Sequence, residues 1–174
     1  MIPRIFARCQ CAAFEDVELH WNAVEKRIRE SRKLVTKLRL IHGDWDSGVA
    51  DTLHSCDSCG QLWQGSFAWA WGENHDNPRY LFKVPIIDLE EWRQTPFIRP
   101  HELLTFSAAF ENVSKGLTEK QDRCKHSDCQ QRAVTYSVFC LRHHIESLQA
   151  IGRFPSSPSG RWFQPYEHLG LVRS

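Results

Sequence analysis

Apolar residues recur with a helical period between residues 16 and 41. They fall at alternating steps of four and three, with Ser31 filling a gap, and this spacing places them on one face of a helix. The apolar positions are Val17, Trp21, Val24, Ile28, Val35 and Leu38. Asp16 can cap the N-terminus, and Gly43 can end the helix. The pattern predicts one long N-terminal helix over residues 16–41.

The opposite face of this predicted helix is charged. Its basic residues are Lys26, Arg29, Lys33 and Lys37. Such a face could bind an acidic groove, but Glu18, Glu25 and Glu30 are interleaved with the basic residues. We therefore interpret it as a solvated surface.

A period of two replaces the helical period further along the chain. Residues 52–55 have the composition of a short strand, residues 61–71 alternate, and residues 80–84 return after a polar loop. The aromatic side chains on one side of the first long strand are Trp63, Phe67, Trp69 and Trp71. The two long strands are predicted to form an antiparallel hairpin, whose aromatic face is covered by the long helix or by a partner.

Two shorter helices are predicted after the hairpin. Asp88 caps the first, with Glu91 three residues later, and Pro100 opens the second. The buried stripe of the second helix is Leu103, Phe106, Phe110 and Val113. Gly116 ends this helix, and the polar residues 115–123 have the composition of a linker.

These elements predict an α+β protein in three parts. Residues 1–117 form a zinc-stapled domain in which the long helix packs on a small antiparallel sheet. Residues 118–151 form a small zinc-finger module. Residues 152–174 are rich in proline and serine and form a tail, whose aromatic side chains dock on the body of the protein or on a partner.

The spacing of the cysteines carries the main chemical information. Cys56 and Cys59 have the spacing of a zinc knuckle, and Gly60 behind them permits the tight turn that such a knuckle needs. A knuckle supplies only half of the ligands that a tetrahedral zinc ion requires. We predict that Cys9 and Cys11 supply the other half.

A second ligand set lies in the C-terminal module. Cys124 and Cys129 precede a strand-like stretch, and Cys140 and His143 lie three residues apart at the start of a predicted helix. Residues at this spacing share a helix face, which suits two ligands of one ion. His144 is an alternative to His143, because position i+4 lies on the same side of the helix.

The two sets account for all seven cysteines of the chain. Two tetrahedral sites need eight ligands, and seven cysteines with His143 provide them. Four protein ligands leave no position for water, so both zinc ions are predicted to be structural. An iron–sulfur cluster is an alternative for the four-cysteine set, but its widely separated pairs favour zinc.

The charge of the chain is nearly balanced but unevenly distributed. The formal net charge is +1, whereas residues 43–112 alone carry 4 basic and 11 acidic residues. Nucleic-acid binding generally requires a basic surface, which this balance does not supply overall. The sequence has no apolar stretch of signal-peptide or membrane-spanning length, so we expect a cytoplasmic protein with reduced thiols.

Two stretches resemble known proteins. The segment CKHSDCQQRAVTYSVFCLRHH, residues 124–144, resembles a small zinc finger of bacterial and phage proteins, some of them fused to HNH-type nucleases. Residues 5–113, with CQC, CDSCGQLW and EEW, are similar to uncharacterised bacterial zinc-binding proteins that include candidate immunity proteins of toxin systems. This second resemblance implies an intracellular protein that binds and neutralises another protein.

The sequence therefore predicts a non-catalytic zinc-binding protein that binds another protein, as an immunity or antitoxin-like inhibitor binds a bacterial toxin. The motifs of metalloproteases, zinc deaminases, α/β-hydrolases and P-loop proteins are absent, so no enzymatic activity is expected. The alternative is a nucleic-acid-binding or regulatory zinc-finger protein. The acidic middle segment is predicted to contact the partner. Its predicted contact residues are Glu73, Asp76, Glu90, Glu91 and Trp92.

Overall fold

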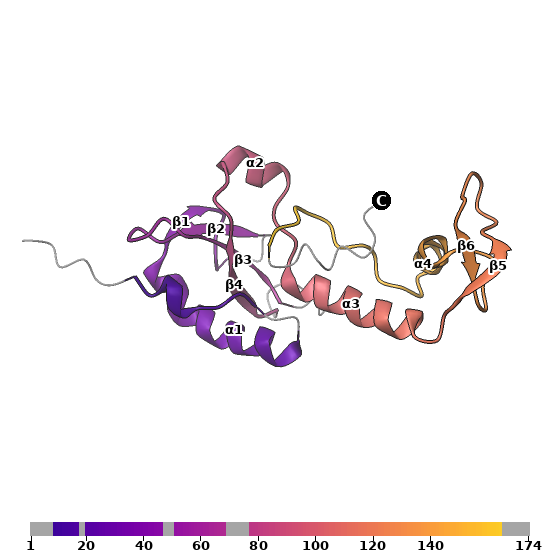
Figure 1. Cartoon of the computed structure of the whole chain (residues 1–174). Helices are drawn as coiled ribbons and strands as arrows, with labels where there is room; N and C mark the ends of the chain where they lie inside the picture. The colour runs from indigo at the N-terminus through magenta and orange to yellow at the C-terminus, as the bar shows by residue number, and fades with distance from the viewer. Residues whose placement is uncertain (1–8, 18–19, 47–50, 69–76, 165–174) are drawn as a thin grey trace, which may run out of the picture. The chain divides into compact units, whose positions relative to one another are not determined.

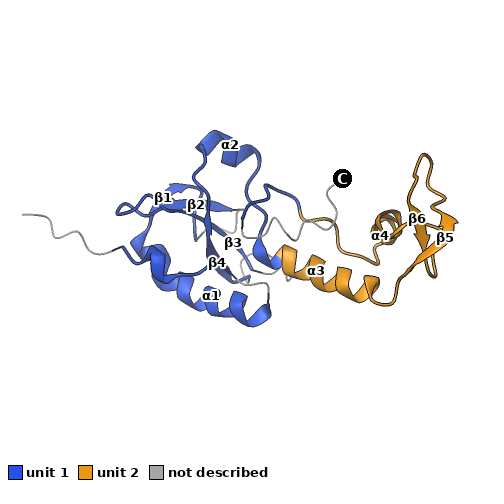
Figure 2. Cartoon of the chain, viewed as in Figure 1, with its two compact units in different colours: residues 1–101, 159–168 blue, residues 102–158, 169–174 orange. Residues whose placement is uncertain are grey.

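The computed structural model of the chain describes residues 9–17, 20–46, 51–68 and 77–164. The chain forms two compact units, which Figure 2 distinguishes by colour. The first unit comprises residues 1–101 and 159–168, and the second comprises residues 102–158 and 169–174. Helices and antiparallel strands occur in both units, in agreement with the predicted α+β class.

A four-stranded antiparallel sheet forms the centre of the first unit (Figure 1). Its strands, in spatial order, are β1 (Arg39–His42), β2 (Thr52–Ser55), β3 (Leu62–Phe67) and β4 (Arg79–Val84). Strand β2 has the predicted bounds, and β3 with β4 form the predicted hairpin, in which Leu62 pairs with Val84. Trp63 and Phe67 are buried as expected. Trp69 and Trp71 lie outside the described residues.

The N-terminal helix is shorter than predicted. Helix α1 spans Trp21–Leu34 and is followed by a single 3₁₀ turn, η2 (Val35–Lys37), and then by β1. The predicted helix over residues 16–41 was wrong at both ends, because His20 rather than Asp16 accepts the capping hydrogen bond, from the backbone of Ala23. At the other end, pairing with β2 holds the residues after η2 in an extended conformation, and this tertiary pairing overrides the helical period.

The buried face of α1 is rotated from the predicted stripe. Its buried residues are Val24, Arg27, Ser31 and Leu34, whereas Trp21 is 47% exposed. Arg27 is buried because its charge is fully engaged. It donates to the backbone oxygens of Leu81 and Glu15 and to the carboxylate of Glu30, and its guanidinium lies 5.6 Å from the ring centre of Phe14. A buried guanidinium is tolerated only when it is paired in this way.

Helix α1 completes the hydrogen bonding of the edge strand β4. The backbone N–H of Leu81 donates to Ser31 Oγ at 2.7 Å, and Arg27 Nη1 donates to the backbone oxygen of Leu81 at 3.3 Å. The hydroxyl of Ser31 in turn donates to the backbone oxygen of Arg27 at 2.7 Å. An edge strand exposes unpaired backbone groups, and here two side chains of one helix satisfy them.

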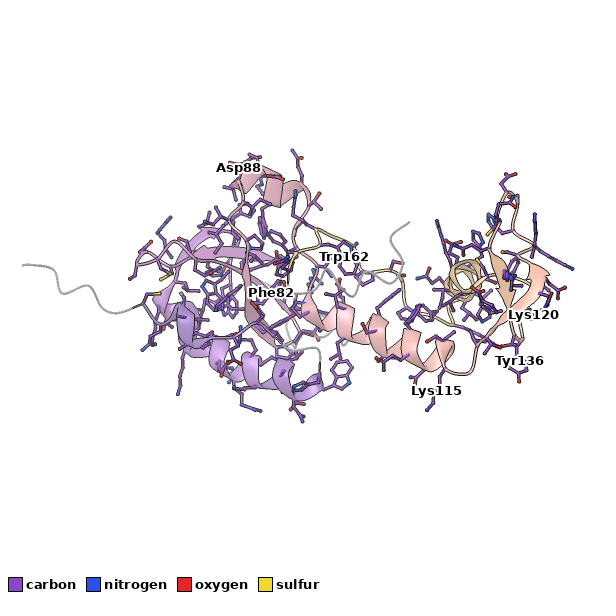
Figure 3. The ribbon with its side chains drawn as sticks, viewed as in Figure 1. Phe82, Asp88, Lys115, Lys120, Tyr136 and Trp162 are labelled. Carbon is purple, nitrogen blue, oxygen red and sulfur yellow. The ribbon has the colours of Figure 1, made fainter. Side chains whose placement is uncertain are left out.

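A buried glutamine connects the sheet to the elements that follow it. Gln64 on β3 accepts hydrogen bonds from Trp92 Nε1 at 2.8 Å and from the backbone N–H of Phe97 at 3.0 Å. Its amide nitrogen donates to the backbone oxygen of Phe97 at 2.9 Å. Trp92 lies on helix α2 (Leu89–Gln94), which Asp88 caps as predicted (Figure 3). This network fixes α2 against the sheet.

The second unit contains α3 (Pro100–Ser114, which begins in the first unit), the two-stranded sheet of β5 (Glu119–Arg123) and β6 (Arg132–Val134), and α4 (Leu141–Ala150). Phe106, Ile145 and Phe154 form its buried core. Because most of α3 packs with the C-terminal elements, the second compact unit begins at residue 102, within α3. Strand β5 lies in the segment that we expected to be a linker.

The predicted C-terminal tail packs on the protein itself in the part that the structure describes. The backbone of Arg161 donates to Pro96 and accepts from Ile98, at 2.8 and 3.1 Å. Phe163 is buried, with its ring centre 4.9 Å from that of Phe97. Residues after 164 lie outside the described residues. No helix in the described ranges is both long and apolar enough to cross a membrane.

We predict that Ser31→Ala destabilises the first unit by about 1–3 kcal/mol, because the buried N–H of Leu81 loses its acceptor. The measurement is urea unfolding followed by tryptophan fluorescence, which reports only on the first unit since all seven tryptophans belong to it. Thr36→Ala is the control, because the hydroxyl of Thr36 is exposed, and its effect should stay within about 0.5 kcal/mol. Equal effects of the two substitutions would contradict the role of Ser31.

Candidate metal centres

The four N-terminal cysteines converge at one end of the first unit. Cys11 lies in the 3₁₀ turn η1 (Cys11–Ala13), two residues after Cys9, while Cys56 and Cys59 lie in the turn after β2. Their four sulfur atoms all lie within 4.8 Å of one another. Cys9 Sγ is 3.6 Å from Cys56 Sγ and 3.1 Å from Cys59 Sγ. Sulfur ligands of a tetrahedral zinc ion are about 3.8 Å apart, so the set has the dimensions of a metal site.

The knuckle geometry follows from its glycine. Gly60 has a φ of +75°, which L side chains rarely adopt, and its N–H donates to the backbone oxygen of Cys56 at 2.8 Å. Burial acts to raise the pKa of Cys56, but the backbone N–H groups of Ser58 and Cys59 and the neighbouring thiols oppose it and hold this pKa at about 7. The turn therefore favours the thiolate, which is the form that binds metal.

Cys11 lies on the buried side of the same set. Burial, followed by the hydrogen bond with Cys9, raises the pKa of the Cys11 thiol, and the indole of Trp63 opposes this rise. Trp63 Nε1 lies near this thiol, but it is buried and meets no acceptor among the described residues at full hydrogen-bond geometry. A buried donor of this kind needs an acceptor, and a thiolate of Cys11 bound to a cation would provide one. The surroundings of Cys11 thus fit a metal ion.

The second set lies in the β5–β6–α4 part of the second unit. Cys124 follows β5, Cys129 lies in the turn before β6, Cys140 is the N-cap of α4, and His143 lies in the first turn of that helix. His143 Nδ1 is 3.3 Å from Cys124 Sγ and 3.4 Å from Cys140 Sγ, and Cys129 Sγ is 3.9 Å from Cys140 Sγ. All four ligand atoms lie within 4.8 Å of one another.

The structure distinguishes His143 from His144. His143 converges with the three cysteines, whereas His144 does not belong to the group. The outer nitrogen of His143, Nε2, lies 3.7 Å from a carboxylate oxygen of Glu146, and the ring of His126 stacks on that of His143 at 3.8 Å between centres. Glu146 and His126 therefore lie where outer neighbours of a ligand histidine would lie. Neither role was predicted from the sequence: His126 was interpreted as a loop residue without a role at the site, and Glu146 lies one helical turn after His143.

The thiol of Cys124 is also adapted to ionise. Burial acts to raise its pKa, but backbone N–H groups of Cys140 and His126, together with His143 and Cys129, lower the pKa to about 6. All seven cysteines are free of disulfide bonds. Each set thus offers four side-chain donors around one point, which is the arrangement of a tetrahedral metal site.

The predicted partner-contact residues have mixed outcomes. Glu90 and Glu91 are exposed on α2, but Glu90 pairs with Arg93 at 3.0 Å and Glu91 with Arg161 at 2.8 Å. The prediction of Trp92 as an exposed anchor was wrong, because its side chain is 1% exposed and bonded to Gln64. Glu73 and Asp76 lie outside the described residues.

Comparisons of the chain with protein-family models, with curated proteins and with solved structures found no match. The two cysteine-rich sets and the surfaces around them are therefore the features of the chain that point to a function.

We predict close to two zinc ions per chain by elemental analysis of protein purified without chelator. Cys56→Ser and His143→Ala should each remove about one ion, since each takes one ligand from a different set. His144→Ala is the matched control and should retain both ions. Loss of an ion from His144→Ala, or one ion in the unmodified protein, would contradict the assignment of the ligands.

Proposed function

We propose that the protein is a non-catalytic zinc-binding protein that binds another protein, and that its partner is a bacterial toxin which it inhibits in the manner of an immunity protein or antitoxin. The proposal that the protein is not an enzyme rests on one observation: each of the two cysteine-rich sets has four protein donors. A catalytic zinc ion keeps a coordination position for water or substrate, and these sets leave none.

Zinc is the metal that suits both donor sets. Four thiolates, or three thiolates and an imidazole, are the ligands of structural zinc sites. In the first set the two pairs come from distant parts of the chain, so a bound ion ties the N-terminal segment to the turn after β2. In the second set the ion ties the hairpin to the start of α4. The absence of disulfides among the cysteines supports a reducing compartment, for which we propose the cytoplasm.

The proposed contact surface is the exposed start of α2. Asp88, Glu90 and Glu91 lie in one short stretch there. The hydrogen bond from Trp92 to Gln64 fixes the helix against the sheet. A rigid surface loses little conformational entropy when it binds. The ion pairs to Arg93 and Arg161 reduce the negative field of this surface, so we expect the carboxylates to exchange these partners for cations of the toxin.

The first test identifies the partner and then measures its association rate. A pull-down from the native host supplies the partner, and surface plasmon resonance compares the protein with Glu90→Lys/Glu91→Lys. Reversal of two surface charges should slow association with a basic partner about tenfold at low salt, and less at high salt. Zinc content and unfolding should stay unchanged, because both side chains are exposed.

Arg29→Glu/Lys33→Glu provides the matched control, since it also reverses two exposed charges on the first unit. It should leave the association rate nearly unchanged. If the charge reversals on α1 abolish binding while those on α2 do not, the proposal that the acidic surface of α2 contacts the partner is wrong.

A further inference from the structure

Two arginines face each other across the β5–β6 hairpin. Arg123, the last residue of β5, is the register partner of Arg132, the first residue of β6, and both side chains are exposed. Like charges in directly opposed positions of an antiparallel pair destabilise it. The repulsion between Arg123 and Arg132 therefore does not contribute to the stability of the hairpin.

A third cation adjoins this pair. Lys125 is exposed, and the residue between it and Arg123 is the buried ligand Cys124. Among the described residues, Arg123, Lys125 and Arg132 make no ion pair with a carboxylate. Arg123 Nη1 donates to Gln130 Oε1 at 3.0 Å, which orients the guanidinium without neutralising it.

The acidic residues nearest to these cations in the chain, Asp122 and Asp128, form no ion pair with them in the described part of the structure. Asp122 lies 3.8 Å from the ammonium group of Lys120, and Asp128 occupies the turn between the two cysteine ligands with a φ of 61°. A metal ion bound to the second cysteine-rich set would hold the cations together, because Cys124 and Cys129 lie in the loop that joins the two strands. The backbone N–H of Cys124 also donates to Gln131 at 2.9 Å and closes that loop.

We infer that this exposed end of the hairpin binds the phosphate backbone of a nucleic acid through Arg123, Lys125 and Arg132. A guanidinium fork matches two phosphate oxygens, and a bound polyanion converts the repulsion between the arginines into shared attraction. A nucleic-acid strand presents a phosphate about every 3.4 Å along its axis, so one strand engages several neighbouring cations at once. A single carboxylate of a protein partner would satisfy only one of them.

This inference goes beyond the proposed function and does not rest on it. The contact surface proposed for a protein partner lies on α2 in the first unit, whereas the three cations belong to the second unit. Reversing charges on one surface leaves the other unchanged. The protein-binding proposal and the nucleic-acid inference can therefore be contradicted independently of each other.

The test is fluorescence anisotropy of a labelled oligonucleotide, single-stranded and duplex, titrated with the full chain in its zinc-loaded form at several salt concentrations. Arg123→Glu/Arg132→Glu should lower the affinity about tenfold or more, and should reduce the slope of log affinity against log salt by about two. Lys115→Glu/Arg153→Glu is the control with the same change in net charge. Both of its residues are exposed in the second unit, Lys115 just after α3 (Figure 3), and it should change the affinity less than about threefold.

The single variant Arg132→Glu separates binding from stability. It places opposite charges across the hairpin, so backbone N–H exchange in residues 119–134 should become about two- to fivefold slower while oligonucleotide affinity falls. A residue with a purely structural role would not lose binding as its strand pair gained stability. If this variant loses zinc, Arg123→Gln/Arg132→Gln replaces it, and it should still lose affinity with its zinc intact.

Three results would overturn the inference. One is the absence of oligonucleotide binding at low salt, and another is an equal loss of affinity in the Lys115 and Arg153 control. The third is displacement of the oligonucleotide by polyglutamate at matched charge concentration, which would assign the surface to an acidic protein instead. The inference would also be overturned if Arg123→Gln/Arg132→Gln kept its affinity for the oligonucleotide.

Discussion

The first unit depends on how the edge of its sheet is closed. Among the described residues β4 is an edge strand of the sheet, and Ser31 and Arg27 of α1 hydrogen-bond the backbone N–H and C=O of Leu81. Arg27 also donates to the backbone oxygen of Glu15, so the same side chain holds the segment that precedes the helix. Phe14 then packs edge-on against Trp63. These contacts hold the N-terminal segment in place, so that Cys9 and Cys11 lie beside the turn that carries Cys56 and Cys59.

The two ligand sets close loops of different length. The first brings together sulfurs up to 50 residues apart in the chain, while the second brings together ligands at most 19 residues apart. Loop-closure entropy grows slowly with length, so the longer loop costs only about 1 kcal/mol more. The larger difference lies in what surrounds each site, because the first set adjoins a core with Leu34, Trp63 and Leu81, whereas the hairpin of the second unit has few buried residues. We therefore expect metal to contribute a larger share of the stability of the second unit.

Local signals in the sequence predicted the features that depend on a few neighbouring residues. The cysteine spacings, the Asp88 cap and Pro100 at the start of α3 are of this kind. The length of α1 was mispredicted because Val35 and Leu38 continue the helical period into residues that turn away to pair with β2. Strand β5 escaped prediction for another reason: nearly all of its side chains are exposed, so no alternation of apolar residues marks it.

Features that depend on distant residues could not be derived from spacing. The burial of Arg27 requires acceptors from residues 15 and 81, and the burial of Trp92 requires Gln64 on another strand. The exposed pair of Arg123 and Arg132 became visible only with the register of the hairpin.

The arginines of the two units show how charge can be assigned to structure or to binding. Arg27 is buried, and its guanidinium donates hydrogen bonds to Glu30, Leu81 and Glu15 of the same chain, so its charge serves the fold. Arg123 and Arg132 are exposed and oppose each other at the end of a hairpin whose loop carries two candidate metal ligands. A metal ion bound in this loop would hold the two arginines close together, whereas an isolated hairpin could relieve their repulsion by separating. The repulsion would then remain available to an anion outside the protein. The net charge of the whole chain, +1, does not reveal such surfaces. It sums the positive end of the β5–β6 hairpin with the acidic start of α2.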